Sequence, residues 1–412
     1  MSHPTGNANV RAIAKGLASK GVLYQFNTTI ASFPGNIWFI LGRVKPLAEF
    51  RRRNFDVLLQ PYTKTYPWYE LGRAFANKLK LKKLVKHESG KFSVDKIYSN
   101  FDKQVAKRLK NAKKNGVTAV YAYEDGALET FREAKKLGLI CIYDLPIAYW
   151  ELGRKLMLEE AIRMPNWAIT LGGGIKDSAK KLERKSEELK LADIVIGPGA
   201  FVLNSLPEWA KNKKLIQSPF GSPKFIAPIS NVQINDKEIS KPLRILFVGS
   251  MGQRKGLGDL FEAMKIINNS NIELIVLGSL LAPLDFYKNE FPNFKYEAGR
   301  SHSEVLLLMQ SCDIFCLPSI VEGRALVIQE AMSQGLPIII TPNTGGEDLV
   351  IENETGFLVP IRSPEAIAEK INWFFENKSQ IAKMGEKAKN HAAKYTWENY
   401  ADTIYNALAI TK

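Results

Sequence analysis

Short apolar runs alternate with stretches of helical periodicity in the second half of the chain. The runs cover residues 244–249, 273–278, 313–318 and 336–341. Runs of this length are typical of strands that are covered on both faces of a parallel sheet. Residues 257–267 instead repeat apolar side chains every three or four positions, which predicts a helix. This alternation predicts a doubly wound α/β domain.

The first half shows the same alternation less regularly. Buried strands are predicted at residues 117–123, 139–144 and 192–197, and a helix over 9–20 has Gly21 as its stop signal. The fold class predicted for the whole chain is α/β, with two Rossmann-like, doubly wound domains. Two such domains leave a cleft between them, and clefts between domains are favoured ligand sites.

A segment rich in proline, serine and asparagine separates the two halves. It predicts a linker over 221–241, an N-terminal domain over 1–220 and a C-terminal domain over 242–395. A chain of 412 residues is long enough for two or three domains of ordinary size.

Charge is distributed unevenly between these domains. The net charge is +15, and residues 1–220 hold 38 Lys and Arg against 20 Asp and Glu, whereas residues 221–412 hold 19 against 22. Residues 43–114 alone contain 20 basic and 6 acidic side chains. Such asymmetry predicts an anionic partner for the N-terminal domain only, whether a membrane surface, a phosphorylated lipid, an acidic glycan or nucleic acid.

Composition also bears on the compartment. Three cysteines are too few for a disulfide framework, which favours a reducing environment. No apolar run reaches the roughly 18 residues of a membrane-spanning helix, and the first residues lack the apolar core of a secretory signal. We therefore expect a cytoplasmic protein.

The strongest chemical signal is the segment PSIVEGRALVIQEAMSQGLPIIITPNTGG at 318–346. Glu322 lies just before a predicted helix, and Glu330 lies about two turns inside it. The amino end of a helix offers N–H groups and a positive dipole end, which suit a phosphate. Gly323 allows close backbone approach, and both carboxylates can accept hydrogen bonds from sugar or ribose hydroxyls. A surface helix with two solvated glutamates is the alternative.

The stretch 243–360 resembles the C-terminal domain of the family 4 retaining glycosyltransferases, which have the GT-B fold. The matching pieces are FVGSMGQRKGLGDLFEA, the block from LPSIVEG to QEAMSQGLPII, and TPNTGGEDLVIENETGFLVP. The resemblance implies the GT-B architecture, in which two Rossmann-like domains face each other across a cleft. It also implies that a final helix, 396–412, crosses back to complete the N-terminal domain.

The resemblance assigns roles to individual residues. In the family, the first glutamate of the pair faces the donor sugar and the second holds the ribose, which places these roles on Glu322 and Glu330. The family's basic pair after the first strand binds the donor pyrophosphate, and here that pair is Arg254 and Lys255. The other donor-binding residues that the resemblance implies in this block are Gly323, Arg324, Ala325 and Leu326.

Two positions depart from the family pattern. Many members carry phenylalanine and a small residue where this chain has Arg324 and Ala325, so Arg324 is expected to add a charge beside the sugar or phosphate. Many members also carry an arginine directly after the strand glycine, where this chain has the donor-side residue Ser250. Arg254 is expected to supply the missing charge. These differences bear on which sugar is bound rather than on the reaction type.

The N-terminal half matches the family more weakly. Residues 3–10 stand where the family has a glycine-bearing loop, so Gly6 and Asn7 are expected near the donor phosphates and the acceptor, with a plain turn as the alternative. Asp144 ends a predicted strand where many members carry a histidine that faces the reacting centre. We expect Asp144 to orient the acceptor hydroxyl or to stabilise charge on the sugar, although a helix or turn cap explains it equally well.

No metal and no resident cofactor are expected. The four histidines lack ligand-like spacing. No Asp-x-Asp occurs, which is the usual signature of metal-bridged sugar transfer on the other glycosyltransferase fold. The only co-substrate expected is the nucleotide-sugar donor.

The basic segment 43–114 contains a candidate membrane helix. Residues 69–87, YELGRAFANKLKLKKLVKH, alternate apolar positions with many lysines. A basic amphipathic helix of this kind can lie on an anionic membrane surface. The alternative is an ordinary helix whose apolar side packs into the domain core.

Taken together, these patterns and the resemblance predict a retaining, metal-independent glycosyltransferase of the hexosyltransferase type, acting in cell-surface glycan, lipid-linked saccharide or glycolipid synthesis. The predicted partners are a nucleotide-sugar donor, a glycan or lipid-linked acceptor and the anionic inner face of a membrane, with no nucleic acid. Two alternatives stay open. One is another GT-B enzyme, such as a nucleotide-sugar epimerase or a phosphorylase, and the other is a basic nucleic-acid-binding protein.

Overall fold

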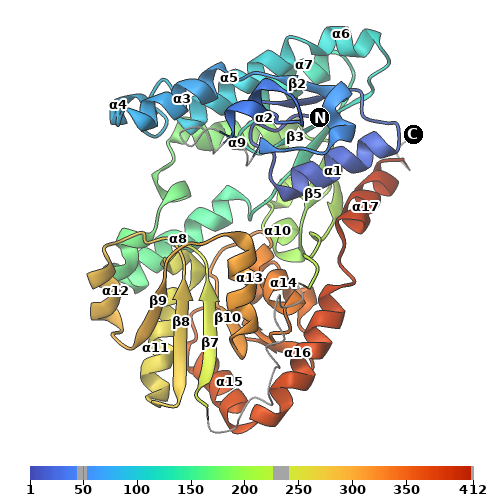
Figure 1. Ribbon diagram of the computed structural model, residues 1–412. Coiled ribbons are helices and arrows are strands. Elements are labelled where there is room, and N and C mark those ends of the chain that lie inside the picture. Colours follow the sequence, from blue (N-terminus) through green and yellow to red (C-terminus); the bar gives the residue numbers. More distant parts are fainter. Residues whose placement is uncertain (44–49, 51–52, 226–240, 410–412) are drawn as a thin grey trace.

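Two parallel sheets form the centres of two stacked domains, with the N-terminal domain at the top of Figure 1 and the C-terminal domain below it. The computed structural model describes residues 1–43, 50, 53–225 and 241–409. Most of the linker predicted over 221–241 therefore lies outside the described residues.

The C-terminal domain is built on a six-stranded parallel sheet of order β12-β11-β10-β7-β8-β9. Its strands are β7 (Leu243–Val248), β8 (Ile272–Leu277), β9 (Phe294–Glu297), β10 (Ile314–Leu317), β11 (Ile338–Ile340) and β12 (Gly356–Leu358). Its helices are α11 (Leu257–Ile267), α12 (Leu284–Glu290), α13 (His302–Gln310), α14 (Leu326–Ser333), α15 (Pro364–Glu376) and α16 (Lys378–Ala392). The winding reverses between β7 and β10, and the loops after these strands diverge there, which is the favoured ligand position in such sheets.

The N-terminal domain has a parallel sheet of order β3-β4-β5-β6, with β1 and β2 as a separate parallel pair. The strands are β1 (Phe26–Thr28), β2 (Thr63–Thr65), β3 (Ala119–Tyr123), β4 (Ile140–Asp144), β5 (Ile194–Gly197) and β6 (Lys214–Gln217). Ser2 links the two sets, because its N–H donates to the Tyr121 carbonyl (2.9 Å) and it bridges Asn27 in parallel. The first residues of the chain thus act as a very short strand beside β3.

Helices cover both faces of this sheet and extend beyond it. The helices of the domain are α1 (Ala8–Ser19), α2 (Ile37–Leu41), α3 (Trp68–Lys78), α4 (Lys82–Val85), α5 (Val94–Ala106), α6 (Leu109–Lys114), α7 (Leu128–Lys136), α9 (Ala179–Leu191) and α10 (Ala200–Asn204). The prediction that the first helix stops at Gly21 is confirmed, since α1 ends two residues earlier and Gly21 has a φ of +68°. Among the described residues, no helix is both long and apolar enough to cross a membrane.

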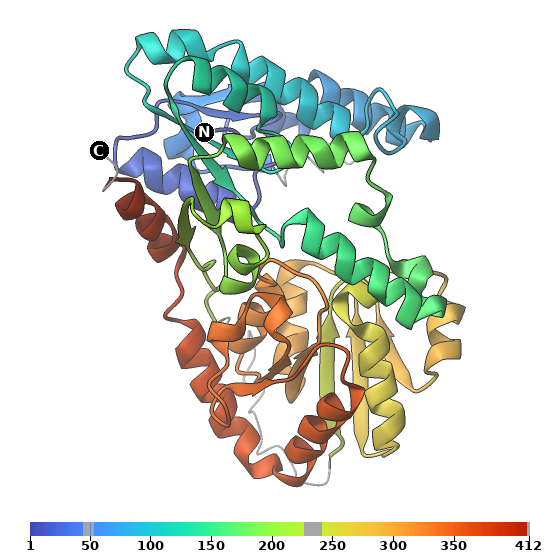
Figure 2. The same ribbon diagram turned by 180° about the vertical axis from the view of Figure 1, so that it is seen from behind.

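Two segments pass between the domains. α17 (Trp397–Ala409) leaves the C-terminal domain and packs on α1, and it buries Tyr400 and Ile404 in the N-terminal core (Figures 1 and 2). In the opposite sense, α8 (Trp150–Arg163) lies over the C-terminal domain, and the following turn buries Trp167 against Phe261, with ring centroids 5.7 Å apart. The predicted N-terminal domain, 1–220, includes this segment, although Trp167 packs in the core of the C-terminal domain.

Candidate functional site

The predicted basic pair meets the first predicted glutamate beyond the carboxyl ends of β7 and β10, where the winding of the sheet reverses. Arg254 and Lys255 belong to the short 3-10 turn η6 (Gln253–Lys255) after β7, and Glu322 lies in the loop after β10. Oε1 of Glu322 accepts a hydrogen bond from the Arg254 guanidinium and lies 2.6 Å from Nζ of Lys255. The N–H of Ile320 donates to the Arg254 carbonyl (2.9 Å), which ties the two loops together.

Lys255 is the more buried of the two cations. Its side chain is 12% exposed, against 34% for Arg254. Burial lowers the pKa of the Lys255 ammonium, Glu322 opposes this shift, and the neighbouring Arg254 adds to it. A partly desolvated cation attracts an anion more strongly than a solvated one, because less water screens the charge.

Glycines shape the turn around Lys255. Gly256 has a φ of +70°, and a Cβ at this position would lie 2.0 Å from the carbonyl oxygen of Pro318. A Cβ on Gly249 would lie 3.6 Å from Cε of Lys255, so the end of β7 packs directly on the lysine stem. Ser250 follows in the same turn and is half-buried. Ser250 therefore lies at the same sheet edge as the basic pair.

Glu330 lies on α14, and its ionic contact is to a residue that sequence reasoning missed. Its Oε1 is 3.7 Å from Nδ1 of His302 at the start of α13, and the Glu330 side chain is 20% exposed. Burial raises the pKa of Glu330, and His302 opposes that shift. The structure thus groups Glu322 with the basic pair and Glu330 with His302, which follows the capping residue Ser301.

The loop of Glu322 also touches the N-terminal domain. A Cβ on Gly323 would lie 1.7 Å from the carbonyl oxygen of Pro146, and the N–H of Ala148 donates to the Glu322 carbonyl at 3.4 Å. Pro146 and Ala148 follow β4, at the carboxyl edge of the N-terminal sheet. Gly323 therefore allows its loop to lie close to the backbone of the N-terminal domain.

The Arg324 guanidinium is buried and donates hydrogen bonds to groups within the protein. Its side chain has no exposed surface, and it donates to both carboxylate oxygens of Asp348, at 2.7 and 3.1 Å. It also donates to the Gly345 carbonyl (3.0 Å) and to Oε1 of Gln329 (2.8 Å). The prediction that Arg324 adds a charge beside the sugar or phosphate is wrong, because a desolvated guanidinium needs these acceptors and is held by them.

The next two predicted donor-binding residues also have partners within the protein. The N–H of Ala325 donates to the Thr344 carbonyl (3.1 Å). The side chain of Leu326 packs against the N-terminal core that contains Val10 and Phe220. The start of α14 is thus held between the two domains.

The predicted glycine loop follows the short first strand. The N–H groups of Thr5 and Gly6 donate to Nδ1 of His3, at 3.0 and 2.9 Å. Burial lowers the pKa of His3 to about 3, so its ring is neutral and can accept these bonds. Gly6 has a φ of +70°, and a Cβ there would lie 2.3 Å from the ring of Phe55. Asn7 is the residue before α1 and makes no side-chain capping bond.

Asp144 points into the N-terminal core. In β4 it shares its face with Ile142, and that face packs against α1 and α17. Its Oδ2 accepts hydrogen bonds from the hydroxyls of Tyr121 (2.6 Å) and Tyr400 (3.4 Å), and the residue is 1% exposed. Burial raises the pKa of Asp144 to about 7, and the tyrosine hydrogen bonds oppose the shift. The expectation that Asp144 orients an acceptor is wrong, since its carboxylate is buried in the N-terminal core and is bonded to Tyr121 and Tyr400.

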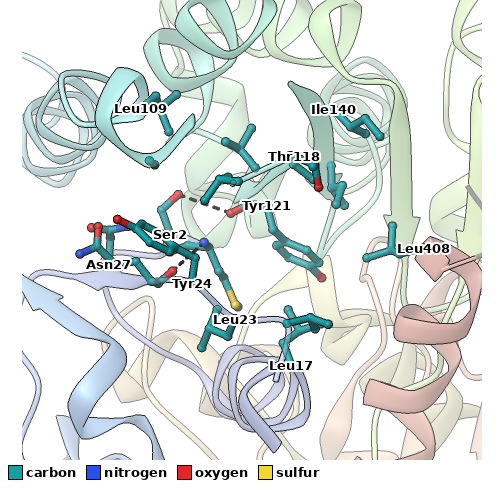
Figure 3. A pocket seen from close by; sticks show the side chains of 18 of the residues that line it. Ser2, Leu17, Leu23, Tyr24, Asn27, Leu109, Thr118, Tyr121, Ile140 and Leu408 are labelled. Carbon is teal, nitrogen blue, oxygen red and sulfur yellow. Dashed lines mark hydrogen bonds between the residues drawn. The ribbon is translucent and has the colours of Figure 1, made fainter. Parts of the chain in front are cut away.

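A pocket of about 460 Å³ lies in the N-terminal domain, and its lining residues come from segments 1–27, 105–194 and 405–409 (Figure 3). It reaches the amino ends of β3, β4 and β5, whereas ligands of such sheets bind at the carboxyl ends. Its apolar lining includes Leu17, Leu23, Leu109, Ile140 and Leu408. The pocket is therefore separate from the candidate site.

His87 forms an ion cluster that its sequence spacing did not reveal. Its Nε2 lies 3.1 Å from Oδ1 of Asp177 and 3.3 Å from Oε1 of Glu88. Nζ of Lys181 lies 3.0 Å from the same Asp177 oxygen and supplies positive charge there. His87 and Asp177 are separated by 90 positions, so only the folded chain brings them together.

The match to a known protein family lies mainly in the C-terminal domain. Residues 231–391 match the family described as "Glycosyl transferases group 1". The uncharacterized glycosyltransferase MJ1178 of Methanocaldococcus jannaschii is 31% identical over 155 residues, which is 37% of this chain and 44% of that protein. The alignments with the first curated relatives cover between 25% and 56% of their lengths.

Two solved structures resemble the chain over nearly its whole length. Sucrose-phosphate synthase from Thermosynechococcus elongatus has a TM-score of 0.65 and 17% identity, over 98% of this chain and 93% of that one. Anabaena HepE in complex with UDP has a TM-score of 0.60 and 14% identity, over 99% of this chain and 98% of that one. At these identities the likeness establishes a shared fold.

Proposed function

We propose that the protein transfers a sugar from a nucleoside-diphosphate sugar to an acceptor hydroxyl, because residues 231–391 match the glycosyl transferases group 1 family and the fold resembles that of sucrose-phosphate synthase. The observation that carries this proposal is the meeting of Arg254, Lys255 and Glu322 beyond the carboxyl ends of β7 and β10. Two adjacent cations suit a diphosphate, one as a planar fork and one as a point charge.

The chemistry of the proposed reaction explains why these cations are held in place. Cleavage of the bond between sugar and diphosphate leaves additional negative charge on the departing nucleotide. Arg254 and Lys255 are already positioned and partly desolvated, so they stabilise this charge without reorganisation. Glu322 beside them is proposed to face the sugar. Retention of configuration and a hexose-type sugar are proposed on the resemblance to family 4 enzymes.

We propose that Glu330 accepts hydrogen bonds from the donor ribose. Its carboxylate has one long ionic contact, to His302, and so retains capacity for hydroxyl donors. UDP is the first nucleotide to test, because the structurally similar Anabaena HepE is described in complex with UDP.

The acceptor is proposed to enter between the domains. The loop of Gly6 and Asn7 and the segment Pro146–Ala148 both lie at the carboxyl edge of the N-terminal sheet, and the second already contacts the Glu322 loop. A glycan or lipid-linked saccharide is the acceptor class proposed, with a role in cell-surface glycan or glycolipid synthesis.

A donor panel tests this function. UDP and GDP sugars carrying glucose, galactose, mannose or N-acetylglucosamine are screened by thermal shift, and turnover is then followed by mass spectrometry with saccharide acceptors. Stabilisation by one nucleotide class and formation of a glycoside are expected. Epimerised donor without acceptor would indicate an epimerase, phosphate-dependent turnover would indicate a phosphorylase, and the absence of any nucleotide binding would reject the proposal.

We also propose that α3 docks on an anionic membrane, which places the protein at the cytoplasmic face. Trp68, Phe75 and Leu79 occupy positions i, i+7 and i+11 of this helix region and are 79%, 63% and 52% exposed. The alternative, in which the apolar side packs into the core, does not hold for these side chains. Exposed basic residues follow at Lys78, Lys80, Lys82, Lys83 and Lys86. Apolar anchors beside basic side chains suit an anionic lipid surface.

Vesicle co-sedimentation tests the membrane proposal. Binding is expected with phosphatidylglycerol vesicles, to fall with added salt, and to be lost in a Phe75→Ser/Leu79→Ser variant. The matched control is Ile162→Ser on α8, because Ile162 is 83% exposed but lies over the other domain. Equal binding to neutral vesicles, or equal loss in the control, would reject the proposal.

A further inference from the structure

A buried ion cluster joins α8 of the first half of the chain to the turn that carries Arg254 and Lys255. Glu160 on α8 and Asp259 on α11 are 0% and 1% exposed. The Arg163 guanidinium contacts both carboxylates, at 2.7 Å from Glu160 and 2.8 Å from Asp259. Two buried carboxylates are costly unless they are paired, so the arrangement holds α8 firmly on the C-terminal domain.

Gln253 connects this cluster to the cationic turn. Its Nε2 donates to Glu160 Oε2 and to Asp259 Oδ2, both at 2.8 Å, and its Oε1 accepts from the N–H of Gly258 (3.0 Å). Its backbone N–H donates to Oγ1 of Thr170 (3.1 Å). Gln253 is 0% exposed, and both of its amide hydrogens and its amide oxygen are used.

Gln253 is the first residue of the turn that carries Arg254 and Lys255. Gln253, Arg254 and Lys255 form a single 3-10 turn, in which the N–H of Gly256 donates to the Gln253 carbonyl (2.9 Å). In so short a turn, rotation of the first residue displaces the side chains of the second and third. A displacement of about 1 Å in a positioning contact can cost on the order of 100-fold in activity.

We propose that Glu160 is a positioning residue for the diphosphate-binding pair and acts through Gln253. The inference rests on the proposed function. The proposal gives α8 a defined role. This helix follows the loop after β4, and its residue Glu160 bonds the first residue of the turn that carries Arg254 and Lys255. Glu322 contacts the two cations directly, and Glu160 accepts a hydrogen bond from Gln253 at the start of the turn. Both contacts are present without a ligand, so the turn is preorganised.

The test compares a nucleotide with its phosphate-free nucleoside, because only the phosphates meet Arg254 and Lys255. Calorimetry is carried out with UDP and uridine, and with GDP and guanosine, on the wild-type protein and on Glu160→Gln. The variant keeps the side-chain volume but loses one acceptor oxygen and the charge. The affinity for the preferred diphosphate is expected to fall about 10- to 100-fold while nucleoside affinity is unchanged.

Two further variants separate positioning from folding. Glu159→Gln is the matched control, since Glu159 is the neighbouring acid on α8, pairs with Arg362 at 2.9 Å and makes no bond to Gln253. It should leave both affinities unchanged. Thr170→Val removes the acceptor of the Gln253 backbone bond, together with the hydroxyl that donates to the Trp167 carbonyl (2.7 Å), and should reduce diphosphate affinity by a smaller factor.

The outcomes are distinct. Equal loss of diphosphate and nucleoside affinity in Glu160→Gln, or wild-type values for both in Glu160→Gln and Thr170→Val, would overturn the inference while the proposed function stands. A wild-type protein that prefers no diphosphate over its nucleoside would overturn the proposed function and this inference together.

Discussion

Nζ of Lys255 lies 2.6 Å from Oε1 of Glu322, although the two residues belong to loops after different strands. The carboxylate therefore balances the charge of a cation that burial has partly stripped of water. A bound diphosphate would bring a second anion to the same ammonium and leave Glu322 beside the sugar. This arrangement makes separate predictions for the cation and for the acid.

The substitution Lys255→Ala is expected to reduce sugar transfer by about 10²- to 10³-fold, because it removes a positioned charge from the leaving group. Initial rates measure the loss, and circular dichroism checks that the fold is intact. Lys265→Ala is the control, since Lys265 lies on the following helix and pairs with the exposed Glu262. Unchanged turnover in Lys255→Ala would remove this residue from its proposed role.

The two glutamates are expected to differ in what they affect. Glu330→Ala should weaken nucleoside-diphosphate binding by about tenfold, or ~1.4 kcal/mol, because it removes an acceptor for the ribose. Glu322→Ala should lower turnover far more than nucleotide affinity, because its carboxylate is proposed to face the sugar. Calorimetry gives the affinities and steady-state kinetics gives kcat and KM. The reverse pattern would exchange the two assignments.

Gly323→Ala is expected to disturb the closure of the two domains. An added Cβ would lie 1.7 Å from the Pro146 carbonyl oxygen, which is backbone and cannot rotate away. Turnover should fall while nucleotide affinity is nearly unchanged, and small-angle scattering should show a larger radius of gyration. Gly172→Ala is the control, because a Cβ at Gly172 would meet nothing within 4 Å. Identical scattering for Gly323→Ala and the wild type would contradict the prediction.

Arg324→Ala should destabilise the fold. The substitution leaves the buried Gly345 carbonyl and the buried Gln329 amide oxygen without their guanidinium donor, and a buried polar group left unsatisfied costs about 1–3 kcal/mol, whereas water can solvate the exposed Asp348. Urea unfolding measures the loss. Arg324→Lys should not restore stability, because an ammonium cannot form the paired bonds to Asp348. A variant as stable as the wild type would restore the expectation of a donor-facing charge.

Asp144 should make stability depend on pH. Its pKa is raised by burial to about 7 in the folded protein and is about 3.9 in an unfolded chain. Between these values the folded state holds a proton that the unfolded state has released, so the free energy of unfolding falls as pH rises from about 4 to 7. Asp144→Asn lacks this effect, and its stability relative to the wild type should increase by a few kcal/mol between pH 5 and 8.

Urea unfolding of both proteins at each pH checks this prediction. Burial also raises the pKa of Glu188, to about 8, but Glu188 is present in both proteins, so the difference between them isolates Asp144. A difference that does not change with pH would show that Asp144 remains ionised beside Tyr121 and Tyr400.

The central strands and the donor-side motifs could be predicted from local pattern. β7, β8, β10 and β11 carry apolar side chains on both faces, and continuous apolar runs of this length are typical of buried parallel strands. The edge strands β6 and β9 were missed, because Lys214–Gln217 and Phe294–Glu297 mix polar and apolar residues as exposed edges do.

Side-chain direction could not be predicted in the same way. Strand alternation places Asp144 on the face of Ile142, but only the packing of α1 and α17 shows that this face is the closed core. Arg324 stands in the right loop, yet Asp348 turns its guanidinium inward. His302 comes to Glu330 through the packing of α13 beside α14 and has no motif of its own.

By itself, the sequence determined the alternation of strands and helices, the two-domain α/β class, the positions of Arg254, Lys255 and Glu322 after strands, and the position of Glu330 on the helix that follows Glu322. These follow from short-range periodicity, which a chain carries regardless of its partners. Only the tertiary structure decided which of these side chains meet, that α8 packs on the second domain, and that Asp144 and Arg324 are interior groups. Those outcomes depend on how buried charges find acceptors across distant segments, which local pattern does not encode.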